Sequence, residues 1–163
     1  MAETGQRVIR LARSTDAEFI GALSRVRIEH GLSWRWRPVR IRRLLADRRT
    51  TVIVAEDEGT LSGFAIMSFA ETSAHLNLLA VRKQFGGIGV ATSLMEWLVG
   101  SCRVAGTGRI NLEVRAGNSR AISFYRRHEF EQVGLHRGYY DGREDALLMS
   151  RRLIPLEQEA KRP

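Results

Sequence analysis

A cluster of glycines stands between a run that alternates like a strand and a run that repeats like a helix. The segment GGIGVATSLMEWL begins at Gly86, and its three glycines are followed at once by apolar residues at helical spacing. Glycine allows positive φ angles and a close backbone approach, and a helix start exposes N–H groups that have no partner within the helix. The segment therefore predicts a tight strand-to-helix turn. Such a turn is compatible with an anion cradle and equally with a purely structural role.

The other sequence patterns alternate between strand-like and helix-like segments, which indicates an α/β fold. The chain has 163 residues, 44% of them hydrophobic, so one domain with a substantial core is expected. Strands are expected over 8–11, 51–55, 63–69, 74–81, 109–114, 130–135 and 146–153, and helices over 15–29, 38–46, 89–99 and 118–128. Thr15 and Glu18 have the spacing of a capping box, and Asp141-Gly142 is a strong turn pair. Residues 1–153 are therefore predicted to form a single domain with a mixed sheet, and residues 154–163 a C-terminal tail.

Positive charge is concentrated in one segment of the chain. The formal net charge is +8, and 24 of the 26 basic side chains are arginines. Residues 25–49 hold nine arginines against Glu29 and Asp47, which is an excess of seven positive charges. Core-type residues interleave with these arginines at helical spacing. We therefore interpret the segment as a solvated helix face, with nucleic-acid binding as the less favoured alternative.

The composition favours a reduced, cytoplasmic setting. Cys102 is the single cysteine and cannot form an internal disulfide. No apolar run approaches the roughly 20 residues that a membrane span needs, and the N-terminal segment lacks the apolar core of a signal peptide. We therefore expect a cytoplasmic protein that has no membrane as a partner.

Two motifs in the second half of the chain resemble the GNAT superfamily of N-acetyltransferases. AVRKQFGGIGVATSLMEWL is similar to the acetyl-CoA signature of that family, a strand ending in Ala-Val, then Gln/Arg-x-x-Gly-x-Gly/Ala, then a helix. The signature can be aligned from Gln84 or from Gly86; the second alignment keeps the helix spacing but puts glycine where Gln or Arg is usual. LEVRAGNSRAISFYRRHEF resembles a later family motif, Asn-x-x-Ala-x-x-x-Tyr-x-x-x-Gly-Phe, with Glu129 in place of its glycine. The resemblance covers about half of the chain.

The resemblance implies a GNAT-type mixed, mostly antiparallel sheet with helices on both faces, and acetyl-CoA as co-substrate without a metal. It is closest in its motifs to bacterial enzymes that acetylate the N-terminal alanine of a ribosomal protein. The residues that it implies for acetyl-CoA binding are Leu79, Ala80, Val81, Gly86, Gly87, Ile88, Gly89, Val90, Ala91, Thr92, Asn118 and Tyr125. A backbone N–H near residues 79–81 would meet the carbonyl oxygen.

Acetyl transfer to an amine needs a proton acceptor and a proton donor. The resemblance implies that the hydroxyl of Tyr125 lies near the sulfur, and a tyrosine stays protonated at neutral pH. Two residues are candidates for the base. Glu113 matches a glutamate of the ribosomal-protein acetyltransferases, and His75 matches the first histidine of the Ala-His-Leu-His strand in arylalkylamine N-acetyltransferases, where Asn77 replaces the second. Glu113 is slightly favoured, and both alternatives stay open.

Acceptor recognition is expected from the N-terminal helices and the last hairpin. Tyr139 and Tyr140 resemble paired tyrosines that close over the peptide backbone in protein N-terminal acetyltransferases. Trp34 would line the site for a small amine or, as we favour, anchor its loop to the core. The expected partner is an amine, either a protein N-terminus or a small amine or amino acid. A non-catalytic acyl-CoA sensor is the alternative, nucleic acid is not expected, and homodimer formation is left open.

Overall fold

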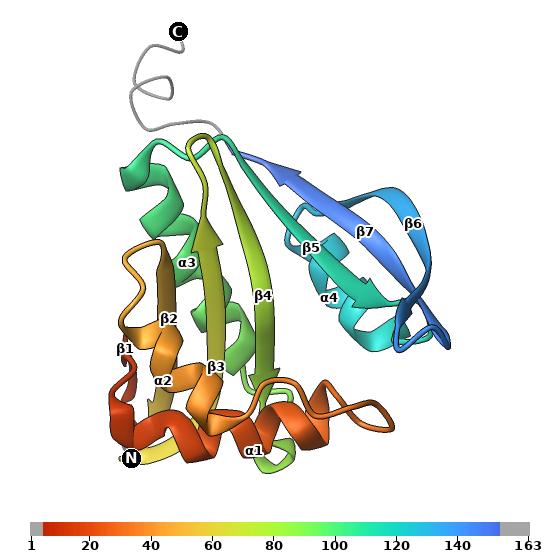
Figure 1. Ribbon diagram of the computed structural model, residues 1–163. Helices are drawn as coiled ribbons and strands as arrows, with labels where there is room; N and C mark the ends of the chain where they lie inside the picture. Colours follow the sequence, from red (N-terminus) through yellow and green to blue (C-terminus); the bar gives the residue numbers. More distant parts are fainter. Residues whose placement is uncertain (1–4, 154–163) are drawn as a thin grey trace, which may run out of the picture. The chain divides into compact units, whose positions relative to one another are not determined.

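The computed structural model describes residues 5–153, and Figure 1 shows the arrangement of their helices and strands. The strands are β1 (Arg7–Leu11), β2 (Thr50–Asp57), β3 (Thr60–Phe69), β4 (Ser73–Val81), β5 (Arg109–Arg115), β6 (Glu131–Tyr140) and β7 (Glu144–Arg152). The helices are α1 (Ala17–Arg27), α2 (Pro38–Leu45), α3 (Val90–Ala105) and α4 (Ser119–Arg127), with short 3-10 turns η1 (Ser14–Asp16) and η2 (Lys83–Phe85). This is the predicted order of elements. The predicted tail, residues 154–163, lies outside the described residues.

The seven strands form one mixed sheet in the order β1-β2-β3-β4-β5-β7-β6. The ladders β1–β2, β2–β3, β5–β7 and β6–β7 are antiparallel, whereas β4 and β5 pair in parallel. The prediction of a mixed, mostly antiparallel sheet is therefore confirmed. The described residues divide into two compact units, the first comprising residues 5–68 and 78–99 and the second comprising residues 69–77 and 100–153.

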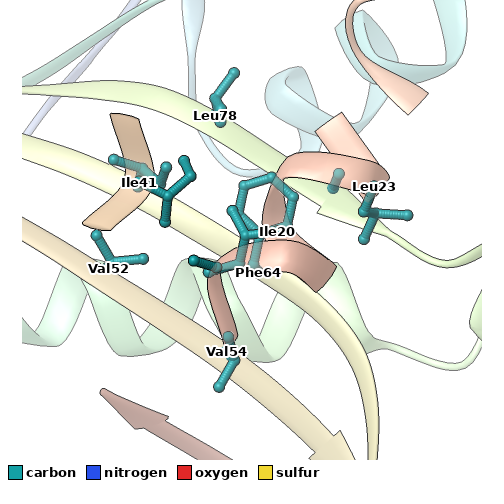
Figure 2. Close-up of a cluster of buried hydrophobic side chains, with 10 residues drawn as sticks. Ile20, Leu23, Ile41, Val52, Val54, Phe64 and Leu78 are labelled. Atoms are coloured by element: carbon teal, nitrogen blue, oxygen red, sulfur yellow. The ribbon is translucent and has the colours of Figure 1, made fainter. Parts of the chain in front are cut away.

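The first unit has a sheet that is covered by helices on both faces. On one face, Ile20 and Leu23 of α1 and Ile41 of α2 pack with side chains of β2, β3 and β4, as Figure 2 shows. On the other face, a Cβ built on Gly63 of β3 would lie 3.2 Å from Val90 and 3.3 Å from Leu94, both on α3. Strand β3 is buried on both faces as a result, which explains its nearly continuous apolar sequence.

The second unit contains the β5–β7–β6 part of the sheet and helix α4. Strand β5 alternates buried and half-buried residues, so one of its faces belongs to the core. Helix α4 is capped by Asn118, whose side-chain oxygen accepts a hydrogen bond from the Ala121 N–H at 3.1 Å. The turn at Asp141-Gly142 forms as predicted, with φ angles of 54° and 69°.

Three local expectations were wrong in detail. The predicted capping box does not form, because the Asp16 carboxylate accepts the Arg13 N–H at 2.7 Å before α1, while Glu18 pairs with Arg42 on α2. Helix α3 continues to Ala105 instead of ending near residue 99. Strand β6 runs on to Tyr140, because bulges absorb the irregular stretch that contains Gly138.

Across residues 5–153, no helix is both long and apolar enough to span a membrane.

Candidate active site

The glycine-rich turn in the first unit is an open backbone loop at the start of helix α3. Gly87 and Gly89 have φ angles of 76° and 88°, which side chains rarely adopt, and no heavy atom lies within 4 Å of a Cβ built on Gly87. Gly86 is extended, with φ −68° and ψ 146°, so its conformation does not demand glycine. The carbonyl of Gly89 accepts the N–H of Ser93 at 3.0 Å, which starts the helical hydrogen-bond pattern. The loop is therefore a tight strand-to-helix turn with open space beside the backbone at Gly87.

Arg7 is part of this loop's surroundings, although nothing in the sequence pattern marked it. Its guanidinium donates to the Ile88 carbonyl and to the Ser93 hydroxyl, each at 3.1 Å. The same group is held by Asp57 at 2.9 Å, the residue opposite Arg7 in the β1–β2 ladder. A contact between residues 81 positions apart leaves no local sequence signal, so only the fold could reveal it.

The end of strand β4 carries the other first-unit residues that the family resemblance implied. Its side chains alternate, so that Leu79 and Val81 are half-buried on one face while Ala80 is buried on the other.

The second unit brings the two candidate bases together. His75 is opposite Asn111 in the parallel β4–β5 ladder, and Glu113 follows Asn111 on the same face of β5. As a result, the Nε2 atom of His75 lies 2.5 Å from Oε2 of Glu113. The Nδ2 atom of Asn77 lies 3.1 Å from the His75 Nδ1 atom. An amide NH₂ donates, so Nδ1 accepts and the neutral imidazole carries its proton on Nε2, facing the carboxylate.

Both partners of this pair remain accessible. The side chain of His75 is 36% exposed and that of Glu113 is 23% exposed. A carboxylate accepts several hydrogen bonds, so Glu113 keeps acceptor capacity after its contact with His75. The accepting nitrogen of His75, by contrast, is used by Asn77. The geometry therefore suits Glu113 as the group that takes a proton and His75 as the group that orients it.

Tyr125 and Tyr140 belong to the same unit as this pair. Tyr125 on α4 is 8% exposed, and its ring meets that of Phe130 edge to face at 5.6 Å. Burial raises the pKa of Tyr125. Burial also raises the pKa of Tyr140, with further contributions from nearby Tyr139, Glu113 and Tyr125. Both hydroxyls therefore keep their protons at neutral pH.

The β6–β7 hairpin is held beside its turn by an ion pair and by a hydrogen bond from the backbone. Arg115 at the end of β5 holds the Glu144 carboxylate with two nitrogens, and Nε lies 2.6 Å from Oε2. The Gly138 N–H donates to Oδ1 of Asp145 at 2.9 Å. The rings of Tyr139 and Tyr140 meet edge to face at 4.9 Å between centroids. The two predicted acceptor tyrosines therefore stand on a well-braced turn.

Two other predicted residues have a structural partner. Trp34 donates its indole N–H to the Gly21 carbonyl at 3.1 Å, and the guanidinium carbons of Arg25 and Arg37 lie 4.9 and 4.8 Å from its ring centroid. These contacts agree with the anchoring role of Trp34. Asn118 caps α4, so its side-chain oxygen is already in use.

The predicted site residues divide between the two units. His75, Glu113, Asn118, Tyr125, Tyr139 and Tyr140 lie in the second unit, and the glycine-rich turn, the end of β4 and Trp34 lie in the first. Arg7 is the addition that the sequence did not single out, whereas Asn77 was noted there as the replacement of a second histidine and contacts His75 in the structure.

The chain is similar to known acetyltransferases in sequence and in fold. It is 35% identical over 95 residues to the [ribosomal protein bS18]-alanine N-acetyltransferase of Escherichia coli (strain K12), covering 56% of this chain and 64% of that protein. The chain thus spans slightly less than two thirds of that relative. It is 28% identical over 156 residues to an N-alpha-acetyltransferase of Sulfurisphaera tokodaii, covering 87% and 90% of the two chains.

A solved structure shows the same architecture over nearly the whole chain. Ard1 from Thermoplasma volcanium superposes with a TM-score of 0.82 at 26% sequence identity, covering 91% of this chain and 98% of that one. The model of the acetyltransferase (GNAT) family matches residues 11–130, which contain the glycine-rich turn, the His75–Glu113 pair and Tyr125. The protein belongs to the GNAT family of acetyltransferases.

Proposed function

We propose that this protein is an N-acetyltransferase that transfers an acetyl group from acetyl-CoA to the free α-amine of a protein N-terminus. The observation that carries this proposal is the 2.5 Å contact between His75 and Glu113 in the unit that also holds Tyr125 and Tyr140. A family fold alone would not distinguish an enzyme from a binding protein, whereas this cluster provides both a proton acceptor and protonated hydroxyls.

Glu113 is the proton acceptor in this proposal. An amine attacks a carbonyl only as a free base, so its proton must leave before or during the attack. The carboxylate of Glu113 takes that proton, directly or through one water molecule. His75 orients the carboxylate through its Nε2–H, and Asn77 fixes the imidazole by donating to its other nitrogen. This contact has the opposite polarity to the one in which a carboxylate or carbonyl accepts from the Nδ1–H of a histidine: Asn77 donates, and the proton is left on Nε2.

Tyr125 is the proposed proton donor. Its burial raises the pKa of the hydroxyl, so the proton stays on Oη at neutral pH. A hydroxyl that remains protonated can donate its proton in a hydrogen bond to the leaving thiolate, which stabilises the negative charge that develops on sulfur as the C–S bond breaks.

The residues of the first unit fit the donor acetyl-CoA, whose thioester supplies the activated acetyl group. The open Gly87 position and the start of α3 offer unpaired backbone N–H groups of the kind that hold a diphosphate. Residues Gly86 to Thr92 would hold this part of the donor, with Leu79, Ala80 and Val81 beside its pantetheine arm, as the family resemblance implies.

The acceptor is proposed to be a peptide for two reasons. The paired tyrosines Tyr139 and Tyr140 stand on a hairpin braced by Arg115 and Glu144, which suits an extended backbone better than a small amine. Two similar proteins are named [ribosomal protein bS18]-alanine N-acetyltransferase and N-alpha-acetyltransferase. The proposed setting is the cytoplasm, since Cys102 is the chain's single cysteine and a buried free thiol.

The test is release of free thiol from acetyl-CoA with a panel of acceptors. The panel contains peptides with free N-terminal Ala, Ser or Met, the same peptides with blocked N-termini and a lysine, arylalkylamines, polyamines and amino acids. We expect turnover on free N-terminal peptides alone. Turnover on small amines alone would replace the peptide proposal with a small-amine acetyltransferase. Binding of acetyl-CoA without turnover on any acceptor would favour an acyl-CoA sensor.

A further inference from the structure

Arg7 has an unusual position for a residue of an edge strand, because it reaches from β1 to the turn before α3. Its three nitrogens engage three acceptors: the Asp57 carboxylate at 2.9 Å and the Ile88 carbonyl and Ser93 hydroxyl at 3.1 Å each. Asp57 is itself held by the Ser62 hydroxyl at 2.5 Å. The guanidinium side chain is 22% exposed, so it is mostly enclosed by these partners. A planar guanidinium with three fixed acceptors has little freedom to move.

The contact with Ile88 determines which way one peptide group of the loop faces. In a trans peptide the carbonyl and the following N–H point in opposite directions. The Ile88 carbonyl points to Arg7, so the N–H of Gly89 points away from Arg7. If this carbonyl were free to turn over, its negative end could replace the N–H and repel an anion.

The next peptide group is held by the same set of contacts. The Gly89 carbonyl accepts both the N–H of Ser93 at 3.0 Å and its hydroxyl at 3.1 Å, and that hydroxyl in turn accepts from Arg7. The Val90 N–H is therefore directed away from Ser93 and out of the helix start. The carbonyls of Ile88 and Gly89 thus have protein donors. The N–H groups of the same two peptide groups, which belong to Gly89 and Val90, are left for a ligand.

We propose that Arg7 is a positioning residue for the diphosphate of the donor, because it holds the Ile88 carbonyl and the Ser93 hydroxyl and thereby keeps the Gly89 and Val90 N–H groups turned outward. This inference rests on the proposed function, which supplies the diphosphate. The role is one of orientation and not of charge alone, since the guanidinium must reach Ile88, Ser93 and Asp57 at once.

The test is the affinity of coenzyme A for the full chain, measured by isothermal titration calorimetry. We expect Arg7→Gln to raise the Kd by about tenfold, the usual effect of losing a hydrogen bond to a charged group. Arg7→Lys keeps the charge but cannot reach all three acceptors, and we expect a loss of at least fivefold, on the order of one such bond. Arg10→Gln is the matched control: Arg10 lies on the same strand and pairs with Asp16 and Glu56.

The control separates orientation of the loop from general loss of stability. We expect Arg10→Gln to change the Kd by less than about twofold, although it breaks two ion pairs. Ser93→Ala is a milder second variant, and we expect a loss of about threefold without a large change in melting temperature. A wild-type Kd in Arg7→Gln or Arg7→Lys would overturn the inference, as would an equal loss in Arg10→Gln. If the wild-type chain itself bound no coenzyme A, the proposed function would fail together with the inference.

Discussion

The contact between His75 and Glu113 leads to a quantitative prediction about how their substitutions combine. Because Nε2 of His75 and Oε2 of Glu113 are 2.5 Å apart, either substitution removes the same interaction. General-base catalysis contributes about 10²–10⁴-fold. We expect Glu113→Gln to lower kcat/KM by about 10³-fold, equivalent to about 4 kcal/mol. His75→Gln leaves the carboxylate in place but unoriented, and we expect a loss of about 10- to 100-fold.

The double variant distinguishes a coupled pair from two separate catalysts. If His75 acts only through Glu113, adding His75→Gln to Glu113→Gln costs no more than about twofold, since there is no longer a carboxylate to orient. If the two residues were independent bases, their losses would instead multiply, and the kcat/KM of the double variant would be about 10⁴–10⁵-fold below that of the wild type. The assay is the initial rate of thiol release with the peptide identified from the acceptor panel, at subsaturating concentrations of both substrates.

The control for this cycle is Glu131→Gln, the same chemical change at an exposed carboxylate at the start of β6. We expect this variant to have a kcat/KM within about twofold of the wild-type value, because a solvated surface group contributes little. Each variant should also bind coenzyme A with wild-type affinity, because His75 and Glu113 are assigned to the acceptor amine. Multiplicative losses in the double variant would refute the assignment of His75 as an orienting group.

Three further predictions follow from other parts of the structure. Tyr125→Phe should lower kcat by about 10²–10⁴-fold with an unchanged Kd for coenzyme A, and rates close to wild type would remove Tyr125 from the mechanism. Gly63→Ala should lower the free energy of unfolding by about 1–3 kcal/mol in urea titrations, since its Cβ would lie 2.8 Å from the Ala80 carbonyl oxygen; an unaffected midpoint would show that the strands can separate. Burial alone would raise the pKa of Asp16, but hydrogen bonds from Arg10 and the Arg13 backbone outweigh it and lower that pKa. The Asp16 contribution to stability is therefore present above its ordinary pKa of 3.8 and is lost as the pH falls below it. In Asp16→Asn the free energy of unfolding should therefore fall less steeply as the pH is lowered. An equally steep fall in the variant would contradict the reasoning.

Several elements could be predicted from the sequence because their causes are local. The β-branched run in β2 and the alternation in β4 define strands within a few residues of their ends. Asn118 caps α4 through a bond to the N–H three residues later. The positive φ angles of Gly87 and Gly89 are a backbone property that glycine makes inexpensive. The family motifs are built from such local features, and for this reason the fold class could be read from them.

Other expectations failed where distant residues compete for the same group. The Thr15 and Glu18 spacing suggested a capping box, but the Glu18 carboxylate pairs with Arg42 on α2, which is 24 positions away. A spacing rule considers only the local partner, whereas the fold offers a second one. The tertiary structure therefore chose between two partners that the sequence alone could not rank.

The sequence by itself predicted which residues would carry proton transfer and where the acetyl-CoA loop would begin. It could not decide between His75 and Glu113, because they lie on different strands, and a register shift of one residue would put Glu113 on the opposite face of β5. The parallel ladder sets His75 opposite Asn111 and thereby brings His75 and Glu113 into contact. Asn77 contacts the other ring nitrogen of His75. The same holds for Arg7, whose contact with Ile88 spans 81 positions. Local patterns follow from backbone sterics and side-chain periodicity, whereas the pairing of distant side chains follows from strand order and register, which exist only in the folded chain.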